Sequence, residues 1–216
     1  MNERMNNKKL FKTLIAVVII ILLFIFISEN VSFKRKAVSN VPDPVQEDAD
    51  GGVTKKIGNY DVNINFLYSY DIKALVVHTK DYNGSDIVCK LSPRDFALAW
   101  GKVAEYNDKI NFHWSQSNRW YYWNVDSYDE IAPVGGEDGV AYHSANNHII
   151  PADKSVKKLV KKVKTGDYIR MKGYLVSINA RNSNGATFNW NSSTTREDTG
   201  DGACEVFYVT DLEWLE

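Results

Sequence analysis

The sequence has few of the residues from which familiar catalytic and metal sites are built. Only two cysteines and four histidines occur among its 216 residues. It has no Gly-x-Ser-x-Gly elbow, the segment that exposes a nucleophilic serine between a strand and a helix. His143 and His148 are five residues apart, which misses the i,i+4 spacing of helical zinc sites, and no third ligand is obvious. We therefore expect no metal and no cofactor.

The N-terminal region lacks both a signal cleavage site and a cysteine placed to take a lipid. Leu14 to Ile27 is an unbroken apolar run, and with its flanks it reaches the roughly 20 residues that cross about 30 Å of hydrocarbon. A cleaved signal peptide is the alternative, but no small-x-small site follows. We expect an uncleaved single-pass signal anchor in the inner (cytoplasmic) membrane, with the C-terminal part outside the cytoplasm, in a periplasmic or equivalent compartment.

Composition divides the chain into four parts. These are a cytoplasmic tail (1–9), the transmembrane anchor (10–30), a flexible tether rich in Pro, Asp, Glu and Gly (31–56), and one extracytoplasmic domain (57–216). The first 36 residues carry seven basic and two acidic residues, which leaves 19 basic and 25 acidic residues in the remainder. An acidic domain binds the phosphates of nucleic acid poorly, so we expect no nucleic-acid partner.

The pattern of the domain predicts an α+β fold in which strands dominate and two helices occur. Alternation over residues 61–66 predicts a half-buried strand, and strands are also expected at 87–91 and 167–179, the latter with a bulge or a sharp curl at Gly173. Helices are predicted from Ser92 to Val103 and from Ala152 to Lys164 with Asp153 as N-cap, and a loop at 133–139. A small barrel of the OB type is one of several folds that fit.

Two polar loops supply the candidate catalytic residues. Residues 142–151 place two imidazoles and a hydroxyl close together, as a general base and a nucleophile require. Residues 190–205 add an arginine that could clamp an anion, and acids whose spacing is not that of an EF-hand loop. The alternative is that both loops are structural and bond their own backbone. The candidates are His143, Ser144, His148, Arg196 and Asp198.

An aromatic segment at residues 112–123 supplies most of the candidate binding residues. On a strand, Trp120 and Tyr122 would face one way, and Arg119, Tyr121 and Trp123 the other. Exposed Trp beside amides and Arg is typical of sugar stacking or of a protein interface, whereas a buried core strand is the alternative. The candidate ligand-binding residues are Gln116, Arg119, Trp120 and Trp123, with Asn146 and Asn147 from the first polar loop.

The two cysteines and a run of lysines each have two interpretations. An even number of cysteines in an exported domain indicates a disulfide between Cys89 and Cys204, and two buried thiols are the alternative. The lysines of residues 154–164 are explained by the solvated side of an amphipathic helix. The alternative is an electrostatic patch for anionic lipid or nucleic acid.

Four segments together resemble a family of uncharacterised bacterial proteins that are membrane-anchored or secreted. The segments are SPRDFALAWG (92–101), SQSNRWYYW (115–123), SANNHIIPA (144–152) and REDTGDGACE (196–205). The resemblance covers most of the domain from about Leu91 onward. It implies a location in the bacterial envelope and implies no particular activity.

Three functions compete on these observations. The first is an extracytoplasmic binding or interaction module, held at the cytoplasmic membrane, with an envelope protein or a cell-wall glycan as partner. The second is an envelope hydrolase in which His148 acts as base beside Ser144, with Arg196 as an electrophilic clamp and Asp198 nearby. The third is a structural subunit of a membrane complex.

Overall fold

The computed structural model describes residues 13–15, 17–20, 35–195 and 204–216. The chain divides into two units, Met1–Arg35 and Lys36–Glu216. Within the described residues, no helix is both long enough and apolar enough to cross a membrane. The predicted cytoplasmic tail and most of the predicted anchor, residues 10–30, lie outside the described residues, so the anchor stays a prediction.

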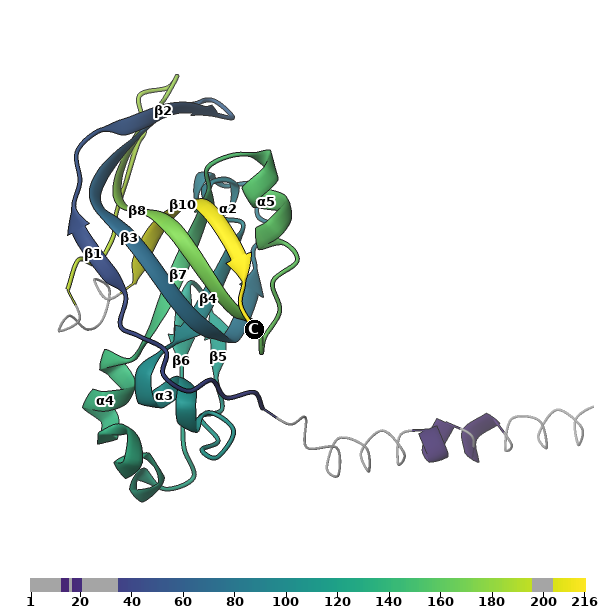
Figure 1. The fold of residues 1–216 in the computed structure, drawn as a ribbon. Helices are drawn as coiled ribbons and strands as arrows, with labels where there is room; N and C mark the ends of the chain where they lie inside the picture. The colour runs from purple at the N-terminus through teal and green to yellow at the C-terminus, as the bar shows by residue number, and fades with distance from the viewer. Residues whose placement is uncertain (1–12, 16, 21–34, 196–203) are drawn as a thin grey trace, which may run out of the picture. The chain divides into compact units, whose positions relative to one another are not determined.

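The second unit is an α+β fold that consists mostly of β-sheet with a few helices, which confirms the predicted fold class (Figure 1). In chain order its elements are β1 (Val45–Asp48), β2 (Gly52–Ile57), β3 (Tyr60–Asp81), α2 (Ile87–Leu91), β4 (Arg94–Ala99), α3 (Gly101–Tyr106), β5 (Ser115–Ser117), β6 (Trp120–Tyr122), the 3-10 helix η1 (Tyr128–Val134), α4 (Gly136–Tyr142), β7 (Ser144–Pro151), α5 (Lys154–Val160), β8 (Tyr168–Asn182), β9 (Thr187–Asn191) and β10 (Glu205–Trp214).

Strand pairing in the large sheet returns to its starting strand. β3 pairs with β4 and β4 with β7, both antiparallel, while β7 pairs with β10 in parallel. β10 then pairs with β8, and β8 with β3, both antiparallel. The remaining strands extend this circuit, because β1 and β2 add to β3 and β9 adds to β8. β5 and β6 form a separate two-stranded sheet.

The prediction of a flexible tether was wrong for the part that the structure describes. Val41 is buried in the core, and residues 45–48 and 52–57 are the strands β1 and β2. On β2, Val53, Lys55 and Ile57 are half-buried while their neighbours are exposed, so the alternation of a strand was present in the sequence. The Gly and acidic residues around it obscured that short signal.

The first predicted helix was also wrong. Residues 94–99 form β4, which is buried along its whole length, and the helix α3 begins only at Gly101, whose φ is +53°. A strand that is covered on both faces has no alternation, so its apolar residues also fit a helical stripe. The reverse error occurred at 87–91, where Asp86 accepts a hydrogen bond from the Cys89 N–H (2.9 Å) and caps the helix α2.

For some elements after residue 133, the prediction and the structure agree more closely. Asp153 caps α5 as predicted, since its carboxylate accepts from the N–H groups of Ser155 (2.6 Å) and Val156 (2.9 Å). Gly173 lies opposite a register shift between Val209 and Asp211, so the irregularity is on β10 and not on the strand of Gly173 itself, where the bulge was predicted. The predicted loop at 133–139 is instead the end of η1 and the start of α4, so two helices were too few.

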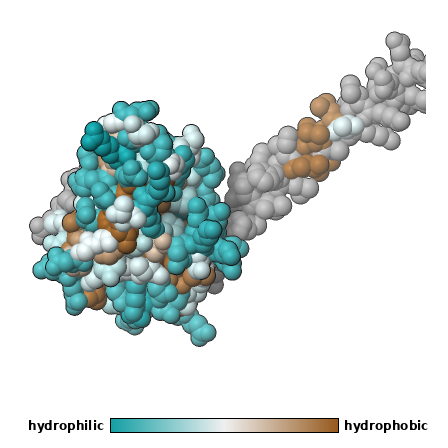
Figure 2. All heavy atoms as spheres, turned by 90° about the horizontal axis from the view of Figure 1, so that it is seen from above, coloured by the Kyte–Doolittle hydropathy of each residue, from teal (hydrophilic) through white to brown (hydrophobic). Residues whose placement is uncertain are grey.

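Two apolar clusters hold these elements together. The larger one joins the strands of the circuit to α3, η1, α4 and α5. The smaller one packs β2, β9 and α2, with the facing parts of β3 and β8, onto residues of β7 and β10. Seen from above, the second unit presents a largely hydrophilic surface with a smaller apolar area (Figure 2).

Candidate functional site

One face of the paired strands β4 and β7 carries a row of buried polar side chains. Asp95 on β4 lies directly opposite His148 on β7 in the antiparallel register. Asn146 is two residues before His148, so the alternation of the strand places it on the same face. Asp95 and Asn146 are 0% exposed and His148 is 3% exposed. Polar groups buried to this degree require partners, and these define the site.

Asp95 is the centre of the row. Its Oδ1 accepts from Arg119 Nη1 (2.8 Å) and from Ser92 Oγ (3.2 Å). Its Oδ2 lies 3.0 Å from His148 Nδ1, although the two atoms are not aligned as a hydrogen bond. One buried carboxylate therefore binds a guanidinium and lies beside an imidazole.

Arg119 reaches Asp95 from the turn of the β5–β6 hairpin. Residues 118 and 119 have φ of +51° and +72°, the left-handed backbone of a tight hairpin turn, where Gly is the usual occupant of the second position. The Arg119 guanidinium stacks at 3.6 Å on the Tyr82 ring, and its Nη1 also donates to Ser92 O (2.9 Å). The Arg119 N–H donates to Tyr82 Oη (2.9 Å), and burial raises the pKa of Tyr82. Several contacts thus fix one strained residue, as at many functional sites.

Asn146 ties the same hairpin to β7. Its Nδ2 donates to the Arg119 carbonyl (2.7 Å), and its Oδ1 accepts from Gln116 Nε2 (2.6 Å). Gln116 Oε1 in turn lies 2.9 Å from Nδ1 of His78 on β3. This chain of hydrogen bonds joins β3, the hairpin and β7, so the polar floor of the site is rigid.

A cavity of about 200 Å³ opens above this floor. The rings of Trp120, Phe188 and Trp190 line it, together with polar side chains that include Arg119 and His148. The Trp190 ring lies 4.7 Å from the His148 ring, so β9 closes over the imidazole. Aromatic faces beside fixed polar groups can bind a ring that is apolar on one side and carries hydrogen-bonding groups on its edge.

The structure brings together only part of the predicted catalytic set. Ser144 is on the strand of His148 but four residues away, roughly 13 Å at the rise of a strand. Its Oγ donates to Val140 O (2.7 Å), and the nitrogen Nδ1 of His143 lies 2.9 Å from Gly139 O, so both serve the end of α4. Arg196 and Asp198 lie outside the described residues. The expected pair of Ser144 with His148 is therefore not formed.

More of the candidate ligand-binding residues than of the candidate catalytic residues lie close together. Gln116, Arg119, Trp120 and Asn146 all belong to the network or to the cavity. Asn147 points to the opposite side of β7, where its Nδ2 lies 3.4 Å from Ala145 O. Trp123 packs against the larger apolar cluster. Four of these six predicted residues thus lie at one place, on the face that His148 shares.

Tyr121 is a further side-chain neighbour of Ser144. The Tyr121 hydroxyl lies 3.3 Å from both the oxygen Oγ and the carbonyl oxygen of Ser144. Burial raises the pKa of Tyr121 to about 12. A phenol with a raised pKa stays protonated at neutral pH, so Tyr121 is not a base for Ser144.

Sequence reasoning missed Asp95 and Trp190. Asp95 had been assigned to the first turn of a helix, and Trp190 to the edge of a polar loop. The one signal for Asp95 was an acid within an otherwise apolar stretch, which indicates a buried, paired carboxylate. No local signal connects Trp190 to His148, because the two residues meet only through the pairing of β8 and β10.

The predicted disulfide is not formed in the structure. Cys89 Sγ instead lies 3.5 Å from Arg119 Nη2, and Cys204 Sγ lies 3.7 Å from Asn146 Nδ2. Both thiols border the candidate site but contact different side chains of the network.

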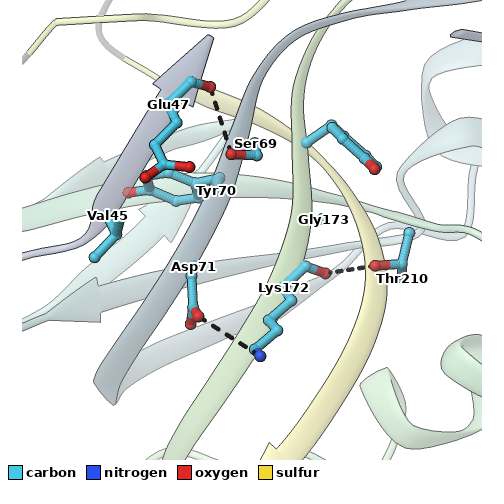
Figure 3. Close-up of a pocket in the computed structure, with 9 residues that line it drawn as sticks. Val45, Glu47, Ser69, Tyr70, Asp71, Lys172, Gly173 and Thr210 are labelled. Carbon is cyan, nitrogen blue, oxygen red and sulfur yellow. Dashed lines mark hydrogen bonds and ion pairs between the residues drawn. The ribbon is translucent and has the colours of Figure 1, made fainter. Parts of the chain in front are cut away.

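A second hollow of about 330 Å³ lies where β1, β3, β8 and β10 run side by side around Gly173 (Figure 3). A Cβ on Gly173 would lie 2.0 Å from the Tyr208 carbonyl oxygen, so only glycine fits at this position. Two of its charged side chains pair with each other, Asp71 and Lys172 (3.8 Å), and Asp71 also binds Arg170 (2.7 Å). We regard it as the weaker candidate, because none of its charged side chains is both buried and available.

Comparison with known proteins provides no further guide: no family model, curated protein or solved structure matches this chain. In the residues that the structure describes, no group of three or more His, Cys, Asp or Glu side chains is arranged to hold a metal ion. The chemistry of the site therefore has to be argued from its own geometry.

Proposed function

We propose that this chain is a membrane-anchored, extracytoplasmic module of the bacterial cell envelope that binds a glycan. The observation that carries the proposal is the cavity of about 200 Å³, in which Trp120, Phe188 and Trp190 stand beside the buried Asp95–His148–Arg119 cluster. The apolar run at Leu14–Ile27 and the resemblance to envelope proteins support the location.

The order of the strands supports a binding role at this cavity. We infer that the closed pairing circuit is a five-stranded barrel of the OB type, in which β3, β4, β7, β8 and β10 take the places of the first to fifth strands. Barrels of this type bind oligonucleotides or oligosaccharides on the second and third strands, between the loop after the first strand and the loop before the fifth. Those positions are β4, β7, the α2 segment and the β9 segment, and all of them except β4 contribute residues that line the cavity.

Charge favours a sugar over a nucleic acid at this position. The chain after residue 36 carries 19 basic and 25 acidic residues, and the cavity's arginine, Arg119, is already paired with Asp95 at 2.8 Å. Binding of nucleic acid depends on cations that neutralise phosphates. A volume of about 200 Å³ is also smaller than a usual drug-sized pocket, so it suits one ring of a longer chain.

The hydrolase alternative retains little of its predicted site among the described residues. His148 has a carboxylate partner, as a general base requires, but Ser144 faces Val140 and Tyr121. The alternative of a structural subunit predicts that the cavity binds nothing and that the chain co-purifies with a membrane protein. Binding and turnover assays with the same glycans separate all three functions.

The proposal is tested by titrating soluble peptidoglycan fragments into residues 36–216 while the tryptophan fluorescence is followed. Trp190→Ala should weaken binding by about tenfold or more, because a stacking platform is lost. Tyr122→Ala is the matched control: Tyr122 is exposed on the hairpin and does not line the cavity. Equal affinities of the wild type and a folded Trp190→Ala variant would contradict the proposal, and release of cleaved glycan would favour the hydrolase.

A further inference from the structure

The lysines of α5 and the turn after it form a basic surface that lacks acidic partners. Its members are all exposed: Lys154, Lys157, Lys158, Lys161, Lys162 and Lys164. Val156, Val160 and Val163 turn the opposite side into the core. Across the described part of the chain, no carboxylate lies within ion-pair distance of any of the six. In a domain with an excess of acids, this element therefore concentrates positive charge on one side.

An exposed tryptophan lies at the C-terminal end of these lysines. Trp214 is 41% exposed, and its Nε1 donates to Asp167 Oδ2 (2.8 Å). The same carboxylate oxygen accepts from the Lys164 N–H (2.8 Å), so the acid is used by the backbone and the indole. Tyr168 lies next to it, and its carbonyl accepts from the Leu215 N–H (2.8 Å). Trp and Tyr beside lysines is the composition of a membrane–water interface.

The chain also enters the second unit at this place. A Cβ on Gly166 would meet Lys36 Cβ at 4.0 Å, and Asn107 Nδ2 donates to Lys36 O (2.9 Å). In the sequence, only residues 28–35 separate the apolar run from Lys36, a reach of roughly 30 Å when fully extended. Lys34, Arg35 and Lys36 add three further positive charges to that connection.

We propose that the surface around Gly166 docks the domain onto an anionic phospholipid bilayer. Lys161, Lys162 and Lys164 contact the headgroups, and Trp214 enters the interfacial region. This inference rests on the anchor in the proposed function, and it adds which face of the domain turns to the lipid. Charge complementarity and the exposed indole favour a bilayer over a soluble polyanion, because a polyanion does not require the tryptophan.

The test uses the full chain in nanodiscs of phosphatidylcholine, with or without phosphatidylglycerol. Acylation of each lysine by a water-soluble reagent is followed by mass spectrometry. Lys161, Lys162 and Lys164 should react about threefold or more slowly in the anionic discs, and molar NaCl should restore their rates because it shortens the Debye length to about 3 Å. Lys56, Lys80 and Lys90, which are exposed on β2, β3 and α2, are the internal controls.

Two variants carry the same charge change at different places. In the triple variant K161E/K162E/K164E, contact of Trp214 with the lipid should be lost, whereas in K56E/K80E/K90E that contact and the protection of Lys161, Lys162 and Lys164 should remain. Fluorescence of Trp214, obtained by difference from Trp214→Phe, should be quenched by brominated lipid in anionic discs.

Equal acylation rates in the two discs, or equal slowing of all lysines, would overturn the docking. A chain that enters neither disc contradicts the anchor instead. The docking is then tested separately by adding phosphatidylglycerol vesicles to that chain. Protection of the same three lysines supports the docking, and absence of protection overturns it.

Discussion

At the scale of single residues, Asp95 organises the candidate site. It is fully buried and takes both Arg119 and His148 as partners, and an Arg119 side chain at positive φ makes sense only because Asp95, Tyr82 and Ser92 hold it. A buried charge with its partners removed is costly, whereas an exposed pair contributes little. The side chain of Asp95 is 0% exposed and that of Asp71 is 32% exposed, so the two aspartates allow this difference to be tested.

Asp95→Asn should therefore destabilise residues 36–216 by about 2–4 kcal/mol, because it leaves the Arg119 charge and the buried imidazole without an anion. The matched change Asp71→Asn removes the partner of Arg170 on the surface and should cost no more than about 1 kcal/mol. Urea unfolding near neutral pH measures both variants. Equal losses would show that Asp95 is no more than a surface charge.

The pH dependence of Asp71 provides a second residue-scale prediction. Hydrogen bonding from Arg170 holds the pKa of Asp71 below its ordinary 3.8. Its contribution to the free energy of unfolding is therefore present above the unfolded value and is lost as the pH falls through the lower folded value. The difference in stability between the wild type and Asp71→Asn should shrink below about pH 4. A difference that stays constant down to about pH 2 would contradict this.

Tyr121 should act at the other end of the pH range. Its pKa is raised from 10.0 to about 12 by burial, so the stability it contributes is present below the unfolded value and is lost as the pH rises toward the folded one. Between about pH 8 and pH 11 the wild type should lose about 1 kcal/mol more than Tyr121→Phe. Parallel losses, measured by urea unfolding, would mean that the phenol ionises freely.

At the scale of elements, the sequence predicts those whose signal is local. The N-cap at Asp153 and the amphipathic pattern of α5 are local, and the structure confirms them. Residues 94–99 were predicted as helix and form a strand, whereas residues 87–91 were predicted as a strand and form a helix. Neither a strand buried on both faces nor a short capped helix has a distinctive hydrophobic period. Whether such a segment becomes a helix or a strand depends on which distant elements pack against it, and the local sequence does not show this.

Gly173 gives a test of one element. With φ at +158° and a Cβ that would lie 2.0 Å from the Tyr208 carbonyl oxygen, Gly173→Ala must push β8 and β10 apart. We expect a loss of about 3 kcal/mol or more, or failure to fold. Gly136→Ala is the matched control, because Gly136 also has positive φ (+71°) but open space around it, so it should cost only about 1–2 kcal/mol. Similar costs for both variants would contradict the steric account.

At the scale of the whole molecule, the site is made by topology. Asp95, Arg119, His148 and Trp190 come from four elements, and they meet because β7 pairs with both β4 and β10 while β9 folds back from β8. Gln116, Arg119, Trp120, Asn146 and His148 were identifiable from residue type alone. Their joint position was not, since long-range pairing leaves no mark in any one segment.

The central claim is that the cavity between β7, β9 and the β5–β6 hairpin binds a glycan. The most direct test is to record the six indole N–H signals of isotope-labelled protein by NMR while soluble peptidoglycan fragments are added. The account predicts shifts for Trp120 and Trp190, which line the cavity, and little change for Trp100, which is buried in the core. Unchanged Trp120 and Trp190 signals at saturating fragment, or shifts confined to Trp214, would contradict it.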